Sequence, residues 1–215
     1  MKYKALILDL DNTLYDYDLA NNHAIASVED HLVKEGFKSR KGFSEAYTLA
    51  RATVKKRLDN LPASHHKLLQ FKEMLYSSGL YDFRMIQSIY EMYKTEFLKK
   101  CVLFEFWRDC LNKYDNVVIL TDYVLDFQLD KINHLAIPNT VKIIASEEFG
   151  LEKPNACLFE AALALLKVKA ENVLMIGDSY EKDILGAKLL GIDSFHLIKE
   201  CRESGFVALA ELLEL

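Results

Sequence analysis

The chain has 215 residues, of which 51% are hydrophobic and 27% are charged, and its formal net charge is −5. These values are typical of a globular protein with one large domain, or with one core and a smaller insert, and they exclude a disordered or fibrous chain. The acidic balance argues against nucleic-acid binding, and no apolar run approaches the ~18 residues that a membrane span needs. With no signal peptide and four cysteines without CxxC spacing, we expect a cytoplasmic protein with reduced thiols and no zinc site.

The first half of the chain predicts one strand followed by a block of helices. An apolar run predicts a strand over 3–8. The next eighty or so residues contain no convincing strand. Apolar residues at spacings of three and four, such as Leu68, Phe71 and Leu75, predict helices instead. The expected helices cover 19–35, 43–58, 64–78 and 82–100.

From residue 117 onward, strands and helices alternate. The expected strands are 117–120, 141–144, 173–176 and 194–198, and the expected helices are 124–134, one from near Pro154, 181–190 and a C-terminal helix. Pro154 suits the first turn of its helix, where no backbone donor is needed. This alternation predicts an α/β fold with a parallel sheet covered by helices on both faces. The helical block at 15–102 is then an inserted cap, and 1–14 with 103–215 form the core.

Charge is distributed unevenly between these two parts. Residues 15–102 contain 14 Lys and Arg against 11 Asp and Glu, whereas the rest of the chain contains 13 against 21. An acidic core suits a metal centre, and a basic insert suits an anionic substrate. The alternative interpretation, variation in solvated helix faces, stays open.

Two carboxylates, Asp9 and Asp11, stand at the end of the first strand. Burying an ionised carboxylate costs several kcal/mol of folding free energy unless it is paired or binds a cation. We therefore expect each of these two aspartates to have such a partner. In α/β proteins, ligands bind at the carboxyl ends of the parallel strands. The pair therefore predicts a metal site at that edge of the sheet.

Three more segments place polar residues after predicted strands. They are Thr121-Asp122, Glu152-Lys153-Pro154, and Gly177-Asp178-Ser179 with Asp183. Parallel strands bring their carboxyl ends to one edge, so these segments can converge with the first pair. Carboxylate oxygens suit Mg²⁺, which uses one or two carboxylates plus substrate phosphate, and a lysine supplies compact positive charge for phosphate oxygens.

In this order, the motifs resemble those of the haloacid dehalogenase (HAD) superfamily. The similarity covers DxDxT, a strand-end threonine, Lys-Pro and GDSxxxD, and 177–192 looks like the GDSLxxDIxGAxxAG pattern of small-molecule phosphatases. The resemblance implies a Rossmann-like parallel sheet core (the HAD fold) with an inserted, all-helical C1-type cap. It implies a Mg²⁺-dependent phosphatase that hydrolyses a small phosphorylated metabolite through an aspartyl-phosphate.

The resemblance also implies roles for individual residues. Asp9 would be the nucleophile, and Asp11 would protonate the leaving oxygen and then deprotonate the attacking water. Thr121 and Lys153 would bind the transferring phosphoryl group. The implied metal ligands are the carboxylates of Asp9 and Asp178 and the backbone carbonyl of Asp11, with Asp183 supporting the metal or fixing Lys153. Thr13 would brace the loop, and Ser179 would lie behind the ligands.

Two features depart from the pattern or lie outside it. Asp122 stands where the family usually has Asn, so we expect its carboxylate to point away from substrate phosphate or to pair with a cap cation. In the insert, His65 and Lys72 are seven residues apart, so they would share a helix face and contact substrate. Arg51, Lys55, Lys56 and Arg57 form a second group of cations, and a solvated helix surface is the alternative for both groups.

Several functions besides a metabolite phosphatase stay open. A haloacid dehalogenase needs no acid at the position of Asp11. A phosphomutase shares the pair of aspartates, and a phosphonate hydrolase would need a cap lysine such as Lys55 or Lys56. A catalytically silent binding protein usually loses the nucleophile or the metal-binding acid, and this chain keeps both. The expected partner is a small molecule, with no nucleic acid or membrane.

Overall fold

The computed structural model describes residues 2–37, 39–59 and 61–215, and the chain divides into two compact units. The core unit consists of the residues up to Asp16 together with Val102–Leu215. The helical unit consists of Tyr17–Cys101.

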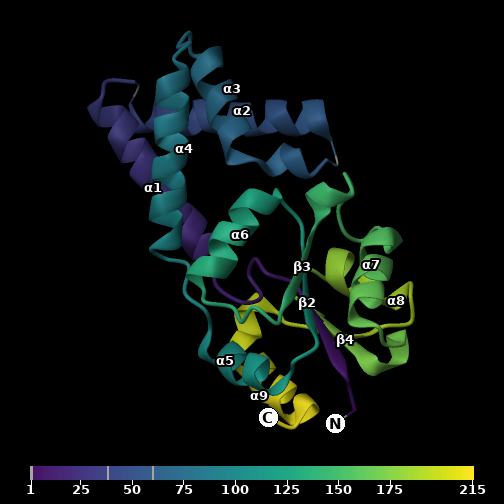
Figure 1. Cartoon of the computed structure of the whole chain (residues 1–215). Coiled ribbons are helices and arrows are strands. Elements are labelled where there is room, and N and C mark those ends of the chain that lie inside the picture. Colours follow the sequence, from purple (N-terminus) through teal and green to yellow (C-terminus); the bar gives the residue numbers. More distant parts are fainter. Residues whose placement is uncertain (1, 38, 60) are drawn as a thin grey trace. The chain divides into compact units, whose positions relative to one another are not determined.

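A five-stranded parallel sheet forms the centre of the core unit (Figure 1). Its strands are β1 (Ala5–Leu8), β2 (Val117–Thr121), β3 (Lys142–Ala145), β4 (Val173–Gly177) and β5 (Asp193–His196), in the order β3-β2-β1-β4-β5. Strand β1 is central and pairs with β2 on one side and β4 on the other. The predicted α/β fold with a parallel sheet is therefore confirmed.

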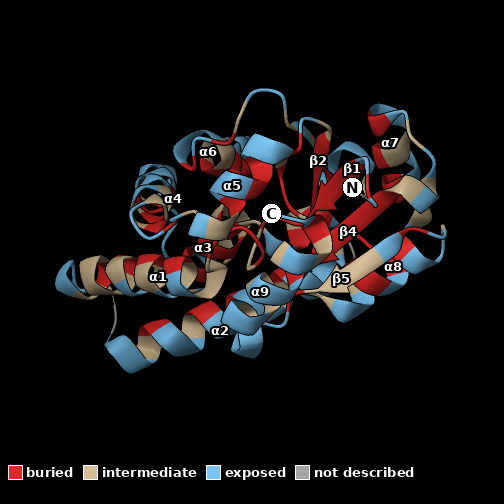
Figure 2. Ribbon diagram, turned by 90° about the horizontal axis from the view of Figure 1, so that it is seen from below, coloured by how far each residue is buried: buried red, intermediate tan, exposed pale blue. Residues whose placement is uncertain are grey.

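Helices cover both faces of this sheet. They are α5 (Glu105–Lys113), α6 (Leu125–His134), α7 (Ala156–Leu166), α8 (Leu185–Lys188) and α9 (Arg202–Leu213). Figures 1 and 2 show α7 and α8 on one side of the sheet and α5 and α9 on the other. Ile7, Val118 and Met175 pack with Leu158 and Phe159 of α7 in one buried cluster. Because both faces are covered, β1, β2 and β4 are buried along their whole length, as their continuous apolar runs predict.

Two features of the core unit differ from the sequence-based expectations. Helix α5 was not predicted, although Trp107, Cys110 and Leu111 have helical spacing and are buried. Helix α7 begins at Ala156, with the Asn155 side chain accepting a hydrogen bond from the Cys157 amide. Pro154 therefore lies outside the helix rather than in its first turn, because Asn155 caps the helix after it.

The helical unit contains the four long helices that its apolar spacing predicts. They are α1 (Tyr17–Lys34), α2 (Arg40–Leu58), α3 (Lys67–Ser77) and α4 (Phe83–Leu98). Phe43, Tyr47, Phe71, Tyr93 and Phe97 form a chain of ring contacts, with centroids 5.7–5.9 Å apart. These aromatic side chains are buried and make the interior of the unit, which fits their interpretation as packing residues.

The predicted helix over 64–78 is split into two elements. A short 3-10 helix, η1 (Pro62–His65), precedes α3, and His66 between them has extended backbone angles (φ −65°, ψ 118°). The expectation that His65 and Lys72 share one helix face is therefore wrong, because the helical backbone is interrupted between them.

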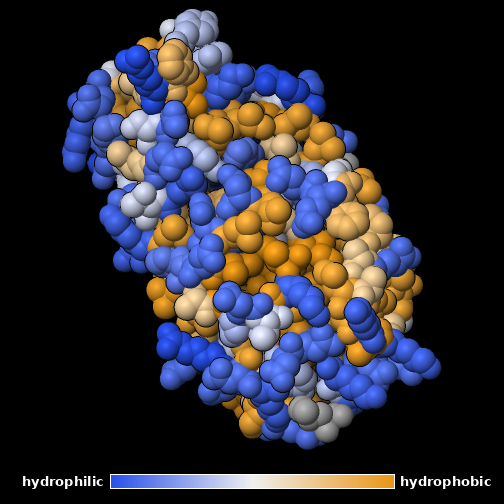
Figure 3. Space-filling view, in the orientation of Figure 1, coloured by the Kyte–Doolittle hydropathy of each residue, from blue (hydrophilic) through white to orange (hydrophobic). Residues whose placement is uncertain are grey.

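Polar and apolar residues are both exposed at the surface. On the face in view, Figure 3 shows hydrophilic residues together with extended apolar areas. Leu49, Tyr81 and Phe83 are among the exposed apolar side chains of the helical unit. Over the described residues, no helix combines the length and apolar character that crossing a membrane requires.

Candidate active site

Charged and polar side chains gather at the carboxyl ends of three neighbouring strands. Asp9 directly follows β1, Thr121 is the last residue of β2, and Asp178 directly follows β4. The parallel register brings these ends to one edge of the sheet. The sheet thus brings together three of the four predicted segments.

Lys153 contacts residues from three of these segments. Its Nζ lies 2.7 Å from Asp9 Oδ1, 2.7 Å from Asp183 Oδ1 and 3.0 Å from the Leu120 carbonyl oxygen. Lys153 is only 3% exposed, and Asp183 is fully buried. Burying a charged ammonium group to this extent is unfavourable unless partners compensate the charge. The lysine and the two carboxylates therefore form one ion-pair cluster.

The second carboxylate oxygen of Asp9 and that of Asp183 each accept a hydrogen bond as well. The Thr13 hydroxyl donates to Asp9 Oδ2 at 2.8 Å, and the Ser179 amide donates to Asp183 Oδ2 at 3.0 Å. Thr13 is fully buried, so its hydrogen bond fixes the Asp9 side chain from within the loop. Asp9 is therefore oriented on both oxygens.

Negative charge exceeds positive charge in this cluster. Burial raises the pKa of the Asp9 carboxyl well above its ordinary value, with Lys153 opposing the shift. Burial and the nearby Asp183 carboxylate raise the pKa of Asp178 to about 6. For Lys153, burial acts to lower the pKa, but Asp183 and Asp9 raise it well above its ordinary value, which keeps the ammonium protonated.

The carboxylates are placed to share a cation. Asp9, Asp178 and Asp183 each offer an oxygen atom, and these atoms lie within 4.8 Å of one another. Oxygen ligands suit Mg²⁺, and a bound cation would relieve the repulsion that raises the pKa of Asp178. The donor set therefore fits a hard divalent cation. The Asp11 side chain is not part of this group.

Asp11 is held by a residue that the sequence interpretation missed. Lys131 of α6, which is 1% exposed, places its Nζ 2.9 and 3.0 Å from the two carboxylate oxygens of Asp11. The Tyr15 hydroxyl also donates to Asp11 Oδ1, and the rings of Tyr123 and Phe127 lie 5.3 and 4.9 Å from Nζ. The signal in the sequence was a lysine on the apolar face of a predicted helix.

Gln128, one turn before Lys131 on α6, was also missed. Its Nε2 donates to Thr121 Oγ1 at 2.5 Å and lies 3.4 Å from Asp11 Oδ2. Thr121 is 1% exposed and Gln128 is fully buried. The side-chain amide of Gln128 thus contacts residues at the ends of both β2 and β1. Helix α6 therefore helps to fix the positions of Thr121 and Asp11.

Asp122 forms an ion pair within the core unit. Lys182 Nζ lies 2.9 Å from Asp122 Oδ2 and 2.8 Å from Glu152 Oε2. The backbone amide of Lys153 donates to Asp122 Oδ1 at 3.0 Å. These contacts tie together the loops after β2 and β4 and the segment that carries Lys153, and a pairing of Asp122 with a cap cation stays a prediction.

Gly177 allows Asp183 to approach β4. A Cβ atom at Gly177 would lie 2.2 Å from Asp183 Oδ2, closer than any real contact. Asp183 sits in η4 (Tyr180–Ile184), a π-helical turn that continues into α8, and the Ser179 hydroxyl accepts from the Lys182 amide at its start. The glycine is thus required by packing against a carboxylate of the cluster.

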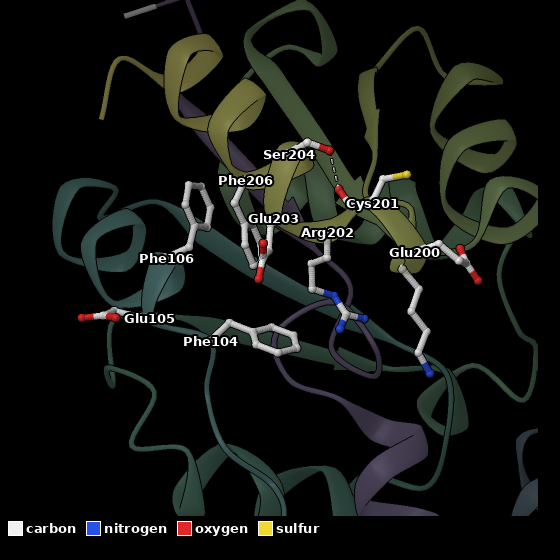
Figure 4. A pocket seen from close by; sticks show the side chains of 10 residues that line it. Phe104, Glu105, Phe106, Glu200, Cys201, Arg202, Glu203, Ser204 and Phe206 are labelled. Carbon is white, nitrogen blue, oxygen red and sulfur yellow. Dashed lines mark hydrogen bonds between the residues drawn. The ribbon is translucent and has the colours of Figure 1, made fainter.

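A separate cavity of about 760 Å³ is lined by residues 104–106 and by residues at the start of α9 and just before it (Figure 4). Arg202 lines it, donates from Nη2 to the Asn12 carbonyl oxygen at 3.0 Å and lies 4.5 Å from the centre of the Phe104 ring. Asn12 has a φ of 66°, so this hydrogen bond stabilises a strained position of the loop. Trp107 Nε1 donates to the next carbonyl oxygen, that of Thr13, at 2.8 Å.

The two predicted substrate contacts of the insert lie on different elements of the helical unit. His65 ends η1 and lines a small cavity of that unit. Lys72 is exposed on α3, where its Nζ lies 5.2 Å from the centre of the Tyr76 ring. A role for either residue at substrate stays a prediction.

The comparison with known protein families identifies the family of this chain. The family model described as haloacid dehalogenase-like hydrolase matches residues 6–197. The chain therefore belongs to this family, and the resemblance of its motifs to the HAD superfamily is confirmed.

Curated relatives that match most of the chain are named phosphatases. A ribulose-1,5-bisphosphate 5-phosphatase from Halopiger xanaduensis is 29% identical over 197 residues, which cover 88% of this chain and 82% of the relative. A glyceraldehyde 3-phosphate phosphatase from Methanocaldococcus jannaschii is 29% identical over 209 residues, covering 91% and 85%. The expectation of an enzyme of the phosphatase type in this superfamily is thereby confirmed.

Solved structures share the fold. A 2-haloacid dehalogenase from Pseudomonas syringae pv. Tomato DC3000 has a TM-score of 0.72 at 20% identity, with 90% of this chain and 86% of that one covered. A HAD phosphatase from Thermococcus onnurineus has a TM-score of 0.66 at 18% identity, with 98% and 97% covered. At these identities the likeness concerns the fold alone.

We predict that Gly177→Ala disrupts the carboxylate cluster. The new methyl group must displace Asp183 from Lys153, because both are buried and neither can retreat into solvent. We expect a loss of about 1–3 kcal/mol in the free energy of unfolding, measured by urea denaturation, as for other overpacked sites. Gly186→Ala is the matched overpacking comparison, since its Cβ would meet the Phe159 ring and the Pro154 backbone and not a carboxylate of the cluster. Equal stability of Gly177→Ala and the native chain would contradict this packing role.

Proposed function

We propose that the chain is a Mg²⁺-dependent phosphatase that hydrolyses a small phosphorylated metabolite through an aspartyl-phosphate intermediate. The observation that carries the proposal is the position of Lys153 Nζ, 2.7 Å from both Asp9 and Asp183, with Asp178 beside them at the strand ends. The Asp9 carboxylate is thus oriented for attack on phosphorus. The Lys153 ammonium beside it can stabilise negative charge on the phosphoryl oxygens. The names of the curated relatives support the same reaction class.

In the first step, a carboxylate oxygen of Asp9 forms a bond to phosphorus as the bond to the leaving oxygen breaks. Asp11 gives its proton to that oxygen, and an alcohol departs. Lys153 and Thr121 bind phosphoryl oxygens, so charge that develops there meets a buried ammonium and a hydroxyl. The Thr13 hydrogen bond keeps the Asp9 carboxylate in place during the attack.

In the second step, water attacks phosphorus and Asp11 takes its proton. The bond between Asp9 and phosphorus breaks, which releases inorganic phosphate and restores both carboxyl groups to their starting forms. Asp9, Asp178 and the Asp11 carbonyl would hold Mg²⁺, which supplies positive charge to the phosphoryl oxygens. Asp183 orients Lys153 at 2.7 Å and adds an oxygen to the same cluster.

The contact with Lys131 bears on how Asp11 works. Lys131 Nζ lies 2.9 and 3.0 Å from the two carboxylate oxygens of Asp11, so it contacts both of the atoms that can carry the proton. Lys131 also fixes both oxygens of Asp11 in one orientation, since it is buried among aromatic rings. We therefore assign Lys131 as a positioning residue for the acid and base.

We propose that the helical unit acts as a cap that restricts access to the site and so selects small substrates. This role rests on the resemblance to C1-capped phosphatases. The leaving group would then be recognised by the insert and the phosphoryl group by the core. A second function, dehalogenation, is disfavoured because a halide needs no proton, whereas this chain orients an acid at position 11 with Lys131, Tyr15 and Gln128.

The first prediction concerns the nucleophile. Asp9→Asn should reduce kcat with an aryl phosphate by at least about 10³-fold, because an amide is a poor nucleophile. Steady-state hydrolysis of 4-nitrophenyl phosphate in Mg²⁺ measures the loss, and urea denaturation shows whether the fold is retained. Asp193→Asn, an exposed aspartate on β5, is the control with the same chemical change. Residual activity within tenfold of the native chain would rule out Asp9 as nucleophile.

The second prediction concerns the cation. Activity should disappear in a chelator and return with Mg²⁺, whereas Ca²⁺ should inhibit. Ca²⁺ takes 6–8 oxygen ligands at longer distances, so it would misplace the attacking carboxylate. Full turnover in the presence of a chelator would exclude a metal role for Asp9 and Asp178.

The third prediction concerns the acid and its lysine. Asp11→Asn should slow release of an alkyl alcohol by about 10²-fold or more, and release of nitrophenolate far less, because nitrophenolate leaves without a proton. Lys131→Met should shift the alkyl-to-aryl rate ratio in the same direction, and Lys131→Arg should restore much of it.

A double-mutant cycle separates this role from a general loss of structure. If Lys131 acts through Asp11, then Lys131→Met should leave the alkyl-to-aryl ratio unchanged in a chain that already carries Asp11→Asn. An equal and independent fall in both rates would show that Lys131 serves only packing.

A further inference from the structure

The helical unit contains a small cavity of about 220 Å³ whose lining is rich in hydrogen-bond donors and contains no carboxylate. Four lining residues, Thr48, Arg51, Ala52 and Lys55, lie at helical positions i, i+3, i+4 and i+7 on α2 and so share one face. The opposite wall comes from η1 and α3. The cavity therefore lies wholly within one unit, between α2 and the segment that follows it.

The inner wall of the cavity is organised by hydrogen bonds. Gln70, which is 3% exposed, accepts from the Tyr47 hydroxyl at 3.2 Å through Oε1. Its Nε2 donates to the Ser64 carbonyl oxygen at 3.4 Å, and Lys67 Nζ lies 3.5 Å from the same Oε1. These contacts join α2, η1 and α3, so the wall is fixed before any ligand arrives.

The two cations on α2 are not neutralised by neighbouring acids. Within the described parts of the chain, no carboxylate oxygen lies within 4.0 Å of Arg51 or Lys55, whereas Arg57 on the same helix pairs with Glu73 at 2.9 Å. Cations in the last turn of a helix interact favourably with the helix dipole, which explains the presence of the basic residues from Lys55 to Arg57. Arg51 lies earlier in the helix and is not explained in this way.

Ser64 supplies the independent observation. Its side chain is 2% exposed and lines the cavity, yet among the described residues its Oγ has no hydrogen-bond partner. A buried hydroxyl without a partner costs about 1–3 kcal/mol, so such groups are normally satisfied by protein, water or ligand. The hydroxyl is therefore available to a group that enters the cavity.

We propose that this cavity is a binding site for a phosphate group. Arg51 and Lys55 would supply the charge, with the Arg51 fork suited to tetrahedral oxyanions, and the hydroxyls of Ser64 and Thr48 would donate to phosphate oxygens. At ~30 Å³ per water molecule, the space holds several waters, which is enough for a phosphate group.

The phosphate can come from two sources. It can be free inorganic phosphate, or it can be a phosphate group of a substrate that carries two. The second possibility rests on the proposed phosphatase function, and the binding site itself does not. Lys72 lies outside the cavity lining, so the inference assigns recognition to Arg51 and Lys55 instead.

Binding is tested on the whole chain, without turnover. Inorganic phosphate is titrated in a chelator at constant ionic strength while the backbone amide signals of Ser64, His65 and Gln70 are followed by NMR. We expect saturable shifts with a Kd of about 1 mM or below, and none with chloride. Arg51→Gln should weaken this binding about tenfold, the loss expected for one charged hydrogen bond.

Two further variants make the binding test decisive. Lys56→Gln makes the same change of charge one residue beyond the lining and should leave binding unchanged. Ser64→Ala should weaken binding several-fold without lowering the urea midpoint, because the hydroxyl has no partner to lose. Unsaturable shifts, equal shifts with chloride, or equal effects of Arg51→Gln and Lys56→Gln would overturn the proposal.

Kinetics then identify the source of the phosphate. The ratio kcat/KM is compared for a sugar bisphosphate and the corresponding monophosphate in the native chain, Arg51→Gln and Lys56→Gln. A tenfold loss confined to the bisphosphate and to Arg51→Gln assigns the site to substrate. Unchanged ratios together with lost phosphate binding assign it to free phosphate. Absence of any hydrolysis would refute the proposed function while leaving the NMR result to decide the site.

Discussion

The compensation of buried charge around Lys153 is the constraint on which the site depends. The ammonium group and the carboxylates of Asp9 and Asp183 come from three separate segments, and none of them is stable at this burial without the others. Their pairing therefore fixes the loops after β1 and β4 relative to the segment before α7. It also leaves an excess of negative charge, which makes the cluster suited to a cation. Burial and the nearby Asp183 carboxylate together raise the pKa of Asp178 to about 6.

Further side chains around this centre hold the residues of the site in place. Asp122 receives the Lys153 amide and the Lys182 ammonium, so the residue that departs from the family pattern connects three loops. Gln128 joins the ends of β1 and β2 in the same way. In both cases, a buried or half-buried side chain holds the backbone or side chain of a site residue, which orients groups on the loops that border the sheet.

Much of the fold and part of the site were predictable because they depend on local patterns. Continuous apolar runs ending in acids mark the buried parallel strands, and the spacing of the motifs predicts that Asp9, Lys153, Asp178 and Asp183 converge. The position of Lys131 was not predictable, because a lysine on an apolar helix face gives no sign of the carboxylate it meets 120 residues away. The break between η1 and α3 was missed for a related reason: apolar spacing continues across His66, whose backbone leaves the helix.

The same logic separates two kinds of cation in this chain. Lys131 and Lys153 are buried and matched to carboxylates, so their charge is used within the protein. Arg51 and Lys55 face a cavity with hydroxyl groups and no acid, so their charge is directed toward a ligand. A sequence count of basic residues treats these lysines and arginines alike. Only the placement of their partners shows which cations hold the fold together and which can recognise a phosphate.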